Sequence, residues 1–169
     1  MKFDKIEAAV RGEVLDEIPV SVWWHFPERD LDGESLCRAQ LAFQRRFDPD
    51  LMKVCPSGGY PAVACGAELA YYGAPPGAPR TSVPTIRSPE DWWTVEALDV
   101  QDGVLGEMLR AIECIGEGLE GRVPFIQTVF SPLTICLKIG GGRLMEDLRS
   151  GSEGVEEALD VISRTMAEF

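Results

Sequence analysis

A chain of 169 residues has the length of one ordinary domain and is long enough to bury a hydrophobic core. It carries 28 acidic and 16 basic residues, a net charge of −12, which argues against nucleic-acid or anionic-membrane binding. The 45% hydrophobic content is typical of a folded protein. No apolar run reaches the roughly 18 residues of a membrane span, and acidic residues stand near the start, where a secretory signal would carry its apolar stretch. We therefore expect a cytoplasmic globular protein.

The cysteines predict neither a disulfide framework nor a metal site. They are odd in number, widely spread and without a CxxC pair, which favours reduced thiols in the cytosol: Cys37, Cys55, Cys65, Cys114 and Cys136. Because His25 is the single histidine, a zinc site would have to borrow scattered cysteines, whereas zinc ligands usually cluster at short spacings. We expect no metal in this chain.

In chain order, residues 3–11 carry apolar side chains at helical spacing and predict a short helix that ends at Gly12. Residues 18–24, Ile-Pro-Val-Ser-Val-Trp-Trp, are apolar at nearly every position and predict a strand buried on both faces. Residues 35–47 predict an amphipathic helix, and residues 50–55 predict a second buried strand. This order of strand, helix and strand is typical of a βαβ unit.

The amino-acid composition changes in the middle of the chain. Residues 56–84 are rich in glycine and proline and predict an excursion that includes a hairpin and no long helix. Ser88 followed by Pro89 is a strong helix start, with serine as N-cap and proline in the first turn. Residues 104–119 then predict a long helix.

The last third repeats the alternation. Residues 123–130 predict a third buried strand, after which Ser131-Pro132 begins a helix over residues 133–139. A short helix over residues 143–149 and a final helix over residues 152–169 follow. Alternating strands and helices predict an α/β protein with a parallel sheet. Three strands and an apolar face on the final helix indicate part of a larger structure.

The segment over residues 121–134, Gly-Arg-Val-Pro-Phe-Ile-Gln-Thr-Val-Phe-Ser-Pro-Leu-Thr, is followed by Gly140-Gly141-Gly142. It resembles a strand-to-helix segment of the uroporphyrinogen decarboxylase superfamily. Ile18-Pro19-Val20 resembles the first strand of that family, and residues 46–50 with Lys53-Val54 resemble the second. The resemblance implies a (β/α)8 TIM barrel. Residues 1–169 would be its N-terminal half, with about three to four barrel strands and the excursion at 56–84.

The resemblance also implies where a site would lie, because barrel active sites form at the carboxyl ends of the strands. After the first strand the family has two arginines and a glutamine; here Arg29 is retained and His25 stands near the first arginine. We predict both as catalytic residues. Further along the chain, the residues that we predict to bind substrate are Ser57, Gly58, Gly59, Tyr60, Ser131 and Lys138. In the loop at 55–60 the family has an aspartate, whereas this chain has no acidic residue there. A tyrosine that the family has in the helix after the third strand is replaced here by Lys138.

Each candidate has a structural alternative. His25 suits a general acid or a partly buried imidazole satisfied by backbone groups, and Arg29 suits a carboxylate clamp or a surface ion pair. The segment over residues 57–60 is either a close approach to ligand or a tight turn. Trp92-Trp93 suits packing better than ligand binding. Arg29, Lys53 and the helix start at Ser131 are the local groups that would attract a polyanionic substrate.

Three functions follow from the resemblance. The first is a decarboxylase-type lyase acting on a tetrapyrrole carboxylate, and the second is the corrinoid-dependent methyltransferase branch, which uses zinc held in the second half of the barrel. The third is a non-catalytic half-barrel or gene fragment. We expect a carboxylate-bearing small molecule as ligand, a separate C-terminal half-barrel or a homo-oligomer as partner, and no cofactor in this chain. Zinc or a corrinoid would enter only with the second function.

Overall fold

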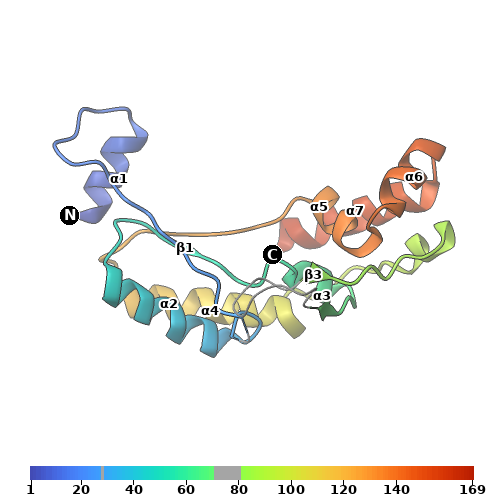
Figure 1. Ribbon diagram of the computed structural model, residues 1–169, viewed down its shortest axis with the longest axis horizontal. Coiled ribbons are helices and arrows are strands. Elements are labelled where there is room, and N and C mark those ends of the chain that lie inside the picture. The colour runs from blue at the N-terminus through green and yellow to red at the C-terminus, as the bar shows by residue number, and fades with distance from the viewer. Residues whose placement is uncertain (28, 71–80) are drawn as a thin grey trace. The chain divides into compact units, whose positions relative to one another are not determined.

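The computed structural model describes residues 1–27, 29–70 and 81–169. The chain divides into two units, of which unit 1 comprises residues 1–56 and 107–128 and unit 2 comprises residues 57–106 and 129–169. Unit 1 contains α1 (Lys2–Val10), α2 (Gly33–Phe47), β1 (Met52–Val54), β4 (Phe125–Gln127) and most of α4 (Gly103–Leu119) (Figure 1). Unit 2 contains α3 (Tyr60–Ala64), β2 (Leu69–Ala70), β3 (Thr81–Ser82), the 3-10 helix η1 (Pro89–Thr94), α5 (Pro132–Gly140), α6 (Arg143–Ser150) and α7 (Glu153–Glu168).

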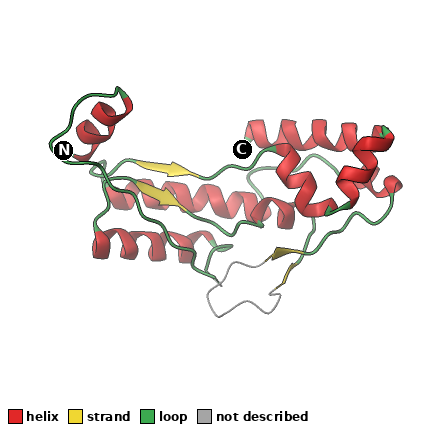
Figure 2. Ribbon diagram, turned by 45° about the horizontal axis from the view of Figure 1, so that its top comes forward, coloured by secondary structure: helices red, strands yellow, loops and turns green. Residues whose placement is uncertain are grey.

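The sheet of unit 1 is parallel, as the sequence predicts. Its strands pair Met52 with Phe125, Lys53 with Ile126 and Val54 with Gln127. Met52 and Val54 are buried on one face of the sheet, and the ring of Phe125 lies on the same face, 3.8 Å from where a Cβ on Gly116 of α4 would be. Figure 2 shows α2 and α4 running side by side along the two strands. Helices therefore cover one face of this sheet.

Helices α2 and α4 are joined covalently and by close packing. Cys37 and Cys114 form a disulfide across 77 residues of sequence, so the prediction that all five cysteines are reduced is wrong for these two. A Cβ on Gly118 would lie 2.4 Å from a methyl carbon of Leu41, which explains a glycine at that crossing. Helix α2 begins as its sequence predicts, because the Asp32 side chain accepts a hydrogen bond from the Ser35 N–H at 2.7 Å.

The predicted strand at residues 18–24 is wrong, because this segment is irregular in the structure. Among the described residues, one backbone hydrogen bond joins it to the start of β1, from the Asp50 N–H to the Val20 carbonyl at 2.8 Å. The Ser21 hydroxyl also donates to the Leu51 carbonyl at 2.9 Å. At Val20 and Ser21 the segment thus lies beside residues 50 and 51, which directly precede β1. Pro19 has no N–H to donate, and Trp24 is 63% exposed.

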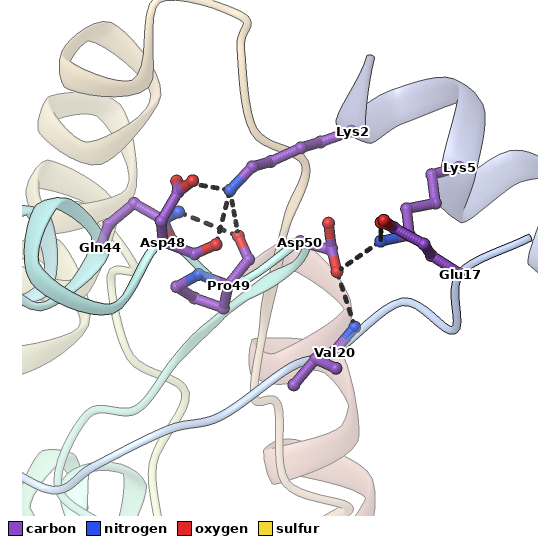
Figure 3. A network of polar contacts seen from close by, with 8 residues as sticks. All are labelled: Lys2, Lys5, Glu17, Val20, Gln44, Asp48, Pro49 and Asp50. Carbon is purple, nitrogen blue, oxygen red and sulfur yellow. Dashed lines mark hydrogen bonds and ion pairs between the residues drawn. The ribbon is translucent and has the colours of Figure 1, made fainter.

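Helix α1 is tied to the turn before β1 by its two lysines (Figure 3). The Lys2 ammonium donates to the carbonyls of Asp48 and Pro49 at 2.8 and 2.7 Å. Lys5 pairs with Asp50 at 3.2 Å, and Asp50 also accepts the N–H of Val20 at 2.8 Å. One carboxylate therefore links the first helix, the irregular segment and the strand.

The predicted strand at residues 123–130 is shorter and more exposed than expected. Only Phe125–Gln127 forms a strand, and Ile126 and Val129 are 51% and 54% exposed. Burial on both faces was therefore a wrong prediction, because the helices of unit 1 cover the Phe125 face alone. Within the described residues the parallel sheet has two strands, β1 and β4, fewer than the three to four expected.

The core of unit 2 forms around Trp92. This side chain is completely buried, and its Nε1–H donates to the Asp147 carboxylate at 2.8 Å. The same carboxylate pairs with Arg143 at 3.0 Å. Gly140 leaves room for the ring, since a Cβ there would lie 2.6 Å from it. The helix start at Ser88 is confirmed, although the helix is a 3-10 helix. Trp92 packs as predicted, whereas its neighbour Trp93 is exposed.

The excursion at 56–84 is partly described. Its residues 71–80 lie outside the described residues, and on either side β2 and β3 pair antiparallel, as a hairpin requires. The helices predicted over residues 133–139, 143–149 and 152–169 are confirmed as α5, α6 and α7. In the described part of the chain, none of the helices is both long and apolar enough to cross a bilayer.

Candidate substrate-binding site

The carboxyl ends of β1 and β4 lead to the residues predicted to bind substrate. Parallel strands end at the same edge of a sheet; β1 continues toward Ser57 and β4 toward Ser131. Within unit 2 the two continuations meet, because the ring centroids of Tyr60 and Phe130 lie 5.9 Å apart. The structure therefore brings together two segments that are about 70 residues apart in sequence.

Residues 57–60 form a tight turn with little access to solvent. The Tyr60 N–H donates to the Ser57 carbonyl at 3.0 Å, and both side chains are buried. A Cβ on Gly59 would lie 2.3 Å from a methyl carbon of Leu69, so a larger residue would displace that side chain. Gly58 has no neighbour within 4 Å of the equivalent position. The turn is therefore closely packed, and Gly58 is its more open residue.

A lysine lies over the aromatic side chains of this region. Tyr60 contacts Phe130 and also Phe169, at 5.9 and 6.0 Å between ring centroids; we call these three residues the aromatic stack. The Lys138 Nζ lies 5.2 Å from the Phe130 centroid, a cation–π contact that typically contributes about 0.5–1 kcal/mol near a surface. Lys138 is half-buried. The arrangement places an ammonium over the ring of Phe130, which is partly buried.

Ser131 caps the helix that carries Lys138. Its hydroxyl accepts the Thr134 N–H at 3.2 Å and lies 2.9 Å from the Thr134 hydroxyl. Pro132 occupies the first turn, as the sequence predicts. The first turn of a helix favours anions through its N–H groups and dipole. Ser131 therefore acts chiefly by fixing the start of α5, beside Phe130.

The two predicted catalytic residues belong to unit 1, whereas the six predicted binding residues belong to unit 2. His25 is half-buried, and its Nδ1 is buried without a hydrogen-bond partner among the described residues. Arg29 is exposed and lines a hollow of about 320 Å³ with Ser35 and Arg38. The alternative in which backbone groups hydrogen-bond to the His25 imidazole is therefore not seen at Nδ1. The Arg29 side chain is accessible to an anion.

The structure adds residues that sequence reasoning missed. Phe130 and Phe169 complete the aromatic stack; Phe130 directly precedes the helix start at Ser131 and could have been suspected from that position. In unit 1, the Lys53 Nζ lies 4.3 Å from the ring centroid of Trp23. Sequence analysis named Lys53 as a local charge and did not connect it with Trp23.

A second hollow in unit 2, of about 580 Å³, is lined by Arg87, Asp91 and Glu96 among others. Asp91 accepts the N–H groups of Arg87 and Ser88 at 2.7 and 2.8 Å, and these hydrogen bonds hold the pKa of its carboxyl below the usual value. That carboxylate caps η1. One oxygen of this carboxylate, Oδ2, thus serves the local structure.

The three free cysteines are buried or half-buried. Burial raises the pKa of Cys65 to about 11 and that of Cys136 to about 12. Burial also raises the pKa of Cys55. These thiols are protonated near neutral pH, whereas the thiolate is the nucleophile and metal ligand. Among residues 1–27, 29–70 and 81–169, no three His, Cys, Asp or Glu side chains cluster as metal ligands.

Comparison with known proteins gives a family and a fold. The sequence profile of the family described as Uroporphyrinogen decarboxylase (URO-D) matches residues 1–169. Among solved structures, a methyltransferase from Methanosarcina mazei matches with a TM-score of 0.73 at 20% sequence identity, covering 97% of this chain and 55% of that one. The chain spans about half the length of that protein, and the likeness indicates a TIM-barrel-like fold. A comparison with curated proteins finds no match.

Proposed function

This chain belongs to the uroporphyrinogen decarboxylase family, and from that premise we propose that it is the N-terminal half of a (β/α)8 barrel that binds a carboxylate-bearing small molecule. The parallel pairing of β1 with β4 supports the barrel. So do the contacts of Val20 and Ser21 with residues 50 and 51 at the start of β1, where an adjacent barrel strand would lie. The match to about half of a longer protein agrees with this proposal.

The reaction that we propose is that of a decarboxylase-type lyase acting on a tetrapyrrole carboxylate. Lys138 carries the proposal, because its ammonium lies 5.2 Å from the ring centroid of Phe130. A carboxylate can pair with the ammonium while the flat ring beside it packs on the aromatic side chain. His25, as a proton donor, and Arg29, as a carboxylate-binding residue, stay predictions within unit 1.

A methyltransferase is the second candidate. It is favoured by the solved structure of similar fold, which is a methyltransferase, and by the turn at residues 57–60, which lacks the acid that the resemblance to a decarboxylase implies. The described residues of this chain hold no cluster of three potential metal ligands. The remaining part of a barrel would have to supply the metal ligands. A non-catalytic half-barrel subunit is the third candidate.

Uroporphyrin I, a fluorescent polycarboxylate, tests the binding proposal directly. We expect quenching of its fluorescence by the chain, and a roughly five- to tenfold weaker Kd for Lys138→Met, since one ion pair contributes about 1 kcal/mol. Arg149→Gln is the matched control, because it removes one exposed positive charge from the same unit. An equal loss in both variants, or no binding by the wild type, contradicts the proposal. Binding of cobalamin in place of uroporphyrin favours the methyltransferase.

A further inference from the structure

The face of the unit 1 sheet opposite the helices carries three side chains at one level. Side chains alternate along a strand, so Lys53 lies on the opposite face from its buried neighbours Met52 and Val54. Its register partner Ile126 shares that face and is 51% exposed. The ring of Trp23, which is 53% exposed, lies 4.3 Å from the Lys53 Nζ. We call Trp23, Lys53 and Ile126 the open-face row.

The open-face row combines a fixed cation with flat apolar surface. The Trp23 ring holds the ammonium by a cation–π contact, which limits the freedom of a long side chain before any ligand binds. Lys53 is the middle residue of β1, two residues before Cys55, where the loop after the strand begins. Active sites of parallel barrels form at this end of the strands.

We propose that Lys53 and Trp23 form a carboxylate-binding subsite for a flat polycarboxylate ligand, with Trp23 and Ile126 packing against its apolar part. The inference rests on the proposed function for its ligand class, and it assigns a second cation in a different unit from Lys138. If apolar strands covered Lys53 without an anionic partner, its ammonium would lose several kcal/mol of hydration free energy. Charge complementarity therefore favours an anionic occupant of this face.

Lysine labelling can test both units in one experiment. The sequence contains four lysines, Lys2, Lys5, Lys53 and Lys138. The chain is treated with an amine-reactive acetyl ester, with and without uroporphyrin I, and the modification of each lysine is measured by mass spectrometry. A carboxylate in contact with an ammonium keeps it protonated and shields it, so we expect labelling of Lys53 to slow at least about fivefold. Lys2, which pairs with Asp48, serves as the internal reference.

Two variants sharpen the result. Trp23→Leu should remove most of the protection at Lys53, and Arg122→Gln, which removes an exposed charge from the same unit, should leave it unchanged. Circular dichroism shows whether each variant keeps its helices. Citrate at the same total charge is the ionic control, and equal protection by citrate overturns the role of the ring.

The outcomes separate the two proposals. Protection of Lys138 without Lys53 overturns the subsite and leaves the proposed function standing, and the open face is then a surface for the remaining barrel strands. Protection of Lys53 without Lys138 supports the subsite and contradicts the proposed role of Lys138. Protection of neither lysine overturns both proposals.

Discussion

Asp50 shows how one side chain can hold three segments of unit 1 together. It accepts the Val20 N–H and pairs with Lys5 (Figure 3). The hydrogen bond from Val20, helped by Lys5, holds the pKa of Asp50 below its usual value despite partial burial. Because the folded pKa is lower than the unfolded one, Asp50 contributes stability above the ordinary pKa of 3.8. That stability is lost as the pH falls through the lower folded value.

The Asp50→Asn variant tests this role. We expect a loss of about 1–2 kcal/mol in the free energy of unfolding at pH 7, since two charge-assisted contacts are weakened. The loss should shrink as the pH falls from about 5 to about 2, because the wild-type carboxylate is then neutralised as well. Urea unfolding at several pH values measures both effects. Asp16→Asn, at an exposed position, is the control; a similar loss there would mean that net charge is responsible.

At the scale of elements, the helices were predicted more accurately than the strands: the strands predicted at 50–55 and 123–130 form over three residues each, and the one at 18–24 does not form. The starts of α2 and α5 follow from local signals, a capping Asp32 or Ser131 and the apolar spacing that comes after. A strand is stabilised by hydrogen bonds to partners that lie far away in the sequence. Residues 18–24 have the composition of a strand and lie beside the start of β1, but they form one backbone hydrogen bond to it. Local pattern cannot show how many neighbours a strand finds.

In the candidate site, too, local features were easier to predict than contacts between distant segments. The turn at residues 57–60 and the helix start at Ser131 are local features; the sequence predicted the helix start and left the turn as one of two alternatives. The contacts of Tyr60 with Phe130 and of Lys53 with Trp23 join distant segments. The spacing of these residues in the sequence does not predict those contacts, and it does not predict the disulfide between α2 and α4.

The Cys37–Cys114 disulfide makes a prediction about two elements. It closes a loop of 77 residues, for which chain entropy gives about 4.5 kcal/mol of stabilisation. Reduction with dithiothreitol should therefore lower the midpoint of urea unfolding, and Cys37→Ala/Cys114→Ala should have the lower midpoint without reductant. The double variant should not respond to dithiothreitol. A wild type equally stable with and without reductant would show that the bond adds nothing to the packing of α2 on α4.

At the scale of the whole molecule, unit 1 exposes many large apolar side chains. They include alternate residues of the irregular segment that lie outside the open-face row: Ile18, Val20, Val22 and Trp24. An unpaired strand-like edge of this kind readily pairs with other chains, and contiguous apolar surface usually marks an interface. A half-barrel is expected to associate for this reason, either with its complement or with itself.

Light scattering after size exclusion tests this expectation on the chain alone. We expect a concentration-dependent mass above the 18.6 kDa of one chain. Val20→Lys/Trp24→Lys should shift it toward the monomer, because charge on an edge opposes pairing. Val10→Lys, at a more exposed apolar position on α1, should leave the association unchanged. Comparing the variants separates an effect at the edge from a general gain in solubility. A wild type that stays monomeric and unfolds cooperatively would contradict the half-barrel, since its open face would then need no partner.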